Sequence, residues 1–111
     1  MFNDANLLDN RSSRTYQNIT YNVTFQTQVK IKFGQTLCCL GSLEELGVWK
    51  EFKHLMKWTE GHNWVSISPL VTNAFFFQYK YAILEKESTE LVEWEKGVDK
   101  IADLEIMPDA R

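Results

Sequence analysis

Between Tyr21 and Phe33 the side chains alternate in character without interruption, and this stretch constrains the fold more than any other. Polar residues occupy every even position from Asn22 to Lys32. The odd positions carry Tyr21, Val23, Phe25, Thr27, Val29, Ile31 and Phe33. Because successive side chains of a strand point to opposite faces, the pattern predicts a long, half-buried β-strand over residues 21–33.

Further strand-like segments follow, separated by residues typical of turns. They cover residues 36–40, 63–68, 74–84, 90–95 and 101–107. Along 75–83 the odd positions form an aromatic face, which leaves Lys80 on the other face. Residues 42–46 could form one helical turn capped by Ser42, but no ten-residue helical period is present. Six to eight short strands without crossover helices predict an all-β fold, an immunoglobulin-like antiparallel sandwich of about seven or eight strands.

The chain length suits one domain with a single core. Residues 1–17 are polar and aperiodic, which predicts a flexible N-terminal tail or linker, and residues 18–111 are expected to form the domain. The end at Met107–Arg111, just past the last expected strand, suggests a module cut from a longer protein.

Charge and cysteine usage restrict the partners. The net charge of −3 and the pI of about 5.3 argue against nucleic acid or a membrane surface, and a monomer with a neutral ligand is expected.

Cys38 and Cys39 are adjacent in a strand, so one is expected to pack inward and the other to be tolerated. His54 and His62 are expected in loops, and no metal or cofactor is predicted. Unpaired thiols and the absence of a visible signal peptide favour the cytosol over secretion.

Two of the four tryptophans stand in unusual surroundings. Trp49 ends a segment with two glycines, and Trp94 lies between Glu93 and Glu95. Such flanks place large apolar faces near the surface, where they usually meet a ligand. An indole stacks well on the C–H face of a sugar ring, and neighbouring polar groups can bind the hydroxyls.

An ordered set of short motifs resembles the starch-binding domain, a carbohydrate-binding module of family 20. The motifs are Phe33-Gly34, Leu40-Gly41-Ser42, Leu46-Gly47-Val48-Trp49, Tyr79-Lys80-Tyr81 and Val92-Glu93-Trp94-Glu95. The resemblance covers about residues 20–107 and implies non-catalytic binding of α-1,4-linked glucan such as starch, glycogen, maltooligosaccharide or cyclodextrin. It also implies two separate sites on an immunoglobulin-like sandwich.

The first site implied by the resemblance comprises Trp49, Lys80, Trp94, Glu95 and Asp99. The two indoles would stack on sugar, while Lys80 and Glu95 would add hydrogen bonds. Many family members carry asparagine at the position of Asp99. Asparagine can donate and accept hydrogen bonds, whereas an ionised aspartate can only accept them.

The second site implied by the resemblance comprises Phe33 and Trp58. Phe33 lacks the tyrosine hydroxyl common in the family, and by its alternation it could equally belong to the core. Trp64 is expected in the core.

Two other classes of function compete with glucan binding. Glu44, Glu45, Glu93 and Glu95 could supply the carboxylate pair of a glycosidase, but one small sandwich rarely provides the deep cleft. A protein-interaction module could use Trp49 and Trp94 as interface anchors. The attached domain, whether of a starch-degrading enzyme, a glucan phosphatase or a glucan transferase, is not indicated by the residues.

Overall fold

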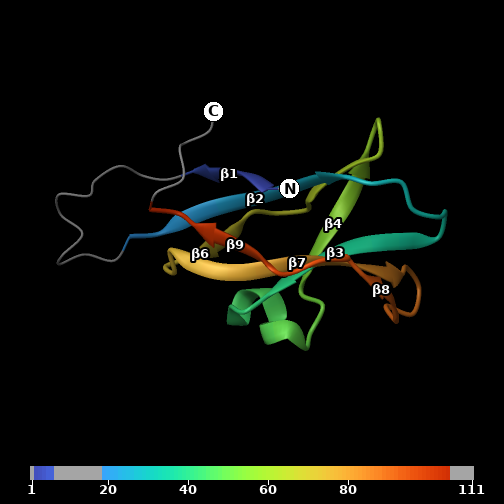
Figure 1. Ribbon diagram of the computed structural model, residues 1–111. Helices are drawn as coiled ribbons and strands as arrows, with labels where there is room; N and C mark the ends of the chain where they lie inside the picture. The colour runs from blue at the N-terminus through green and yellow to red at the C-terminus, as the bar shows by residue number, and fades with distance from the viewer. Residues whose placement is uncertain (1, 7–18, 106–111) are drawn as a thin grey trace.

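A computed structural model describes residues 2–6 and 19–105, of which the first five are described by their backbone alone. It is almost entirely β-structure (Figure 1). The elements in chain order are β1 (Phe2–Asn6), β2 (Tyr21–Gln28), β3 (Gln35–Gly41), the 3₁₀ element η2 (Glu44–Trp49), β4 (His54–Thr59), β5 (Asn63–Ser66), β6 (Leu70–Thr72), β7 (Phe76–Glu85), β8 (Leu91–Trp94) and β9 (Lys100–Asp103). Every strand pairing among these residues is antiparallel, which confirms the predicted fold class.

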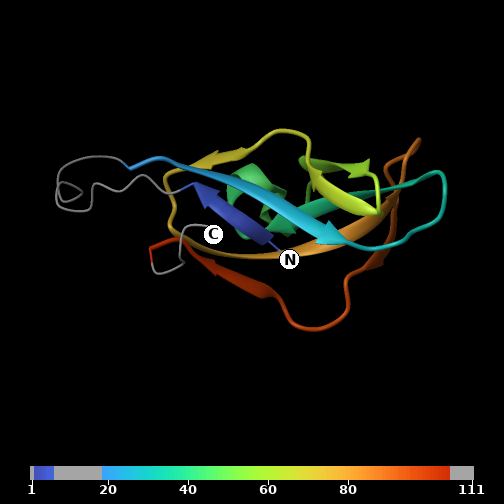
Figure 2. The ribbon, with the colours of Figure 1, turned by 90° about the horizontal axis from the view of Figure 1, so that it is seen from above.

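The strands follow one hydrogen-bonded path that curls into two layers. Its order is β1-β2-β5-β4-β3-β7-β8, with β6 also paired to β2 and β9 also paired to β7. Figure 1 shows β1 and β2 above β7 and β3, and Figure 2 shows β2 crossing over β7 from above. The segment η2 lies on the side of β3 and β7 that faces away from β2 (Figure 1). The fold is therefore an antiparallel β-sandwich.

The main core lies between the two layers and uses the predicted alternation. Phe25 of β2 is fully buried, and its ring centroid lies 6.4 Å from that of Phe77 and 5.0 Å from that of Tyr79, both on β7. Trp64 is buried in the same cluster, as predicted, and its Nε1–H donates to the carbonyl oxygen of Val29 at 3.1 Å. This bond satisfies an indole donor that would otherwise be buried without a partner.

A second, smaller core lies on the other face of β3 and β7. We call this face the outer face and the face toward β2 the inner face. The buried residues of the second core are Cys38, Leu40, Ala82 and Leu84, and the rings packed against them are those of Trp49, Phe52 and Trp94. Cys39 belongs to the inner core, so both cysteines are buried on opposite faces. Burial raises the pKa of the Cys38 thiol to about 12, which keeps it protonated at neutral pH.

Strand β2 changes partner along its length, and a buried hydroxyl bridges the change. Its end pairs with β5, whereas its beginning pairs with β6. At the junction the Ser66 Oγ accepts a hydrogen bond from the Phe25 amide at 2.9 Å. The same oxygen lies 2.8 Å from the Nε2 of His54. The hydroxyl thus supplies the acceptor that a continuous strand would have provided.

The position of His54 predicts a pH-dependent stability. Burial lowers the pKa of His54 below 6.5, because the interior disfavours the imidazolium ion. The unfolded chain therefore binds more protons than the folded one just below pH 6.5, and folding stability falls as the pH drops. In urea unfolding, the wild-type midpoint should be lower at about pH 5 than at about pH 7.5, and His54→Gln should reduce this difference. His62→Gln is the matched control and should show the same difference between the two midpoints as wild type. An unchanged pH dependence in His54→Gln would contradict the assignment.

Several local predictions were wrong. Strand β2 ends at Gln28, five residues earlier than expected, and Phe33 lies in a turn. His54 begins a strand that was not predicted, rather than lying in a loop. Ser42 does not cap η2, whose cap position is Leu43; its hydroxyl instead accepts from the Gln78 amide at 3.1 Å.

The predicted N-terminal tail contains β1, which pairs with β2, while residues 7–17 lie outside the described part of the chain. Among the described residues, no helix is long and apolar enough to cross a membrane.

Candidate functional site

Trp49 and Trp94 meet on the outer face although 44 residues separate them in the sequence. Their ring centroids are 6.4 Å apart and their planes are tilted by 57°. Both side chains are half-buried, because one side packs on the second core while the rest is exposed. The pair therefore presents two rigidly backed aromatic surfaces at an angle to each other.

The backbone that carries Trp49 has an uncommon conformation. Gly47, Val48 and Trp49 all have positive φ, at 87°, 49° and 61°. Gly47 adopts such an angle readily, but Val48 is β-branched, and a left-handed conformation there costs on the order of 1–3 kcal/mol. The amides of Lys50 and Glu51 both donate to the Gly47 carbonyl, which closes the turn.

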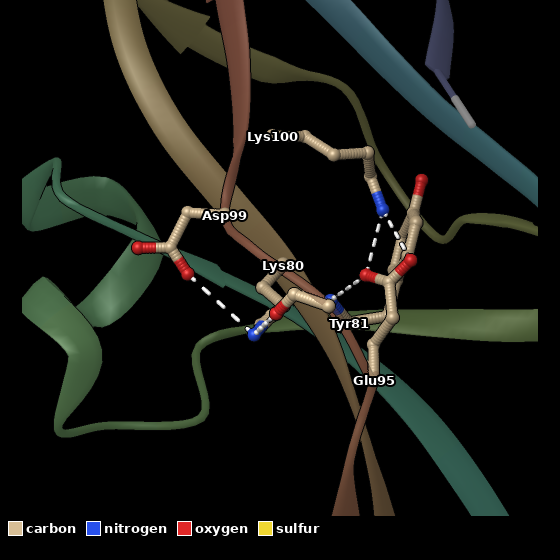
Figure 3. A network of polar contacts seen from close by, with 6 residues as sticks. Lys80, Tyr81, Glu95, Asp99 and Lys100 are labelled. Atoms are coloured by element: carbon tan, nitrogen blue, oxygen red, sulfur yellow. Dashed lines mark hydrogen bonds and ion pairs between the residues drawn. The ribbon is translucent and has the colours of Figure 1, made fainter.

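Lys80 lies on the outer face, as the alternation of β7 predicted. Its side chain is largely buried, with 15% exposed. The ammonium donates to the carbonyl oxygen of Gly97 at 2.5 Å and lies 3.7 Å from Oδ1 of Asp99 (Figure 3). Both partners belong to residues 96–99 of the segment between β8 and β9, which we call the 96–99 loop. Lys80 thus joins the middle of β7 to a loop that begins two residues after Trp94.

Glu95 is directed to the opposite side from Lys80. Trp94 lies beside Ala82 of the second core, so its successor points toward the inner face. The Glu95 carboxylate accepts from the Tyr81 amide at 3.1 Å and from the Lys100 ammonium at 2.6 and 2.5 Å (Figure 3). The structure brings Trp49, Lys80, Trp94 and Asp99 together on the outer face and leaves Glu95 behind them.

Phe33 and Trp58 line a common depression at a different place. Phe33 is fully exposed in the turn before β3, so its ring is not part of the core. Trp58 is 52% exposed on β4, and its Nε1–H donates to Nδ1 of His62 at 3.2 Å. The other residues that line the depression are Ile31, Lys32, Gly34, Gln35, His62, Trp64, Glu85, Lys86, Glu87 and Ser88.

Two residues that support the site around Trp49 and Trp94 were not predicted from the sequence. Phe52 packs against the second core beside the tryptophans, and Lys100 holds Glu95. Phe52 lies three residues after Trp49, an apolar signal that was available in the sequence. Within the described residues, no group of three or more His, Cys, Asp or Glu side chains could hold a metal ion.

Comparison with known protein families matches residues 20–106 to the starch binding domain. A search of curated proteins found no match. The matched range begins just before β2, extends past β9 and includes every residue of both predicted sites. The chain therefore belongs to the starch-binding domain family, whose members are non-catalytic carbohydrate-binding modules for starch and related α-glucans.

Proposed function

We propose that this domain holds α-1,4-linked glucan by stacking sugar rings on Trp49 and Trp94. The observation that carries the proposal is the tilt of 57° between two half-exposed indoles 6.4 Å apart. A helical glucan turn presents successive sugar faces at an angle, so two tilted planes match its curvature better than parallel ones. Packing on the second core fixes the indoles, which lowers the ordering cost of binding.

Polar groups beside the indoles support hydrogen bonding to sugar hydroxyls. The Lys80 ammonium has three N–H donors, and Gly97 accepts one of them. Asp99 is 42% exposed and can accept from a hydroxyl. Because hydroxyls are well hydrated in water, each bond adds little net free energy. The affinity is therefore expected to be of order micromolar to millimolar.

We further propose that the domain acts as a monomeric targeting module that brings an attached domain to glucan in the cytosol. The net charge of −3 disfavours nucleic acid and anionic membranes as partners. Two buried free thiols suit a reducing compartment.

Titration of the isolated chain with β-cyclodextrin, followed residue by residue by NMR, tests the function. We expect binding without release of reducing sugar, and the signals of Trp49 and Trp94 should saturate at lower ligand concentration than that of Trp58. The first site has two indoles and a lysine, whereas the second has Phe33 and one indole. Absence of binding, or turnover of starch by pure protein, would refute the proposed function. Equal affinities at both places would show that the sites are ranked wrongly.

A further inference from the structure

The 96–99 loop leaves β7 and returns to it within a few residues. Trp94 is paired with Ala82, and Lys100 is paired with Tyr79, three residues earlier along β7. Between these pairs the backbone of the loop lies away from β7, and Gly97 has a φ of 99°. The loop carries the Gly97 carbonyl and the Asp99 carboxylate that face Lys80. Its shape therefore decides where these two groups lie.

The two ends of the loop are joined on the inner face by one ion pair. Both oxygens of Glu95 lie within 2.6 Å of the Lys100 Nζ. The side chains are only 34% and 29% exposed, so solvent screens the pair less than a fully exposed one. The Lys100 ammonium also lies 4.6 Å from the ring centroid of Tyr81 and 5.3 Å from that of Tyr79. These rings belong to the inner core, so the pair is fixed to a rigid part of the sandwich.

Glu95 also extends the strand pairing beyond the end of β8. Its amide donates to the Tyr81 carbonyl at 2.9 Å, and its carboxylate accepts from the Tyr81 amide at 3.1 Å. The side chain thus replaces the backbone acceptor that β7 loses where the loop turns away. With these bonds made, the carboxylate faces Lys100 and Tyr81 rather than the outer face (Figure 3).

We infer that Glu95 and Lys100 are positioning residues for glucan binding and do not contact the sugar themselves. Their ion pair closes the base of the 96–99 loop from the inner face, while Lys80 holds the loop from the outer face. This arrangement sets Trp94, the Gly97 carbonyl and Asp99 relative to Trp49. The inference rests on the proposed function, because it assigns roles within the same site.

A double-mutant cycle on the ion pair tests the inference. Glu95→Gln keeps an acceptor for the Tyr81 amide, and Lys100→Met keeps the aliphatic stem. Each should weaken β-cyclodextrin binding about five- to tenfold, and the double variant should be no weaker than either single one. Lys100→Arg keeps a cation opposite Glu95, so this variant should bind β-cyclodextrin within about twofold of wild type. Lys30→Met, which removes an exposed lysine outside both sites, is the charge-matched control and should bind as wild type.

Spectra without ligand separate positioning from contact. In Glu95→Gln and Lys100→Met, the amide signals of residues 96–99 and the indole signal of Trp94 should already shift before sugar is added. Thermal unfolding of each variant establishes that it is folded at the titration temperature. If Lys100→Met unfolds, the comparison of Glu95→Gln with Lys100→Arg carries the test.

Three results would overturn the inference. The first is weakened binding in Glu95→Gln with normal binding in Lys100→Met, which would mean that Glu95 contacts glucan directly. The second is additive losses in the double variant, and the third is unchanged loop signals in both single variants. If wild-type protein bound no glucan, the proposed function would fail, whereas the ligand-free spectra would still decide whether the ion pair positions the loop.

Discussion

Trp94→Ala is expected to weaken β-cyclodextrin binding about ten- to a hundredfold, and Trp49→Ala by a similar factor. In the proposed site each indole supplies one of the two stacking surfaces, and an aromatic contact of this kind contributes about 1–3 kcal/mol to binding. Isothermal titration calorimetry measures the change directly.

The fold should survive either substitution, because both indoles are only half-buried and the main core lies on the other face. Trp58→Ala is the matched control, since it removes an exposed indole from the second site and should leave the tighter binding intact. Normal binding in Trp94→Ala would exclude the stacking role. Loss of the folded state would instead mark the indole as an essential part of the core.

Phe25→Ala should lower the free energy of unfolding by about 3–5 kcal/mol. The ring is fully buried at the centre of the sandwich, where it contacts β7 through Phe77 and Tyr79 and β4 through His54. Its removal leaves a cavity between the two layers that neighbouring strands can fill only in part. Urea unfolding followed by tryptophan fluorescence measures the loss.

Val71→Ala is the control, because it changes an exposed position of β6 and should alter the free energy of unfolding by no more than about 0.5 kcal/mol. Comparable losses in the two variants would place the core elsewhere.

The alternating strands β2 and β7 could be predicted from the sequence, and β3 from its short apolar run, whereas β4 was missed. In β7, Phe77, Tyr79 and Tyr81 are buried on the inner face, which matches the predicted aromatic face. In β4 the alternation is hidden, because Leu55 and Trp58 are apolar yet exposed. Even the clear pattern of β2 extends beyond the strand, since Val29 and Ile31 pack against the core without forming a ladder.

The candidate site could be predicted only in part for a related reason. The resemblance named Trp49 and Trp94, but only the folded chain brings them together across β3, β7 and β8. The direction of Glu95 was available from alternation along β8, because a neighbour of Trp94 must point to the other face. Lys100 gave no such signal, since its position depends on where the loop returns to β7.

The second core has a consequence for how such a domain can diverge. Trp49 and Trp94 both pack against the second core, so under the proposed function the replacement of either indole would alter glucan stacking and this packing at once. Val48 and Val98 are adjacent to site residues in the chain, yet they are 44% and 87% exposed and lie outside the second core. Substitutions at these two valines would not disturb the packing of the second core. Under the proposed function, a change of glucan preference would therefore meet fewer structural constraints at these two valines than at the paired indoles.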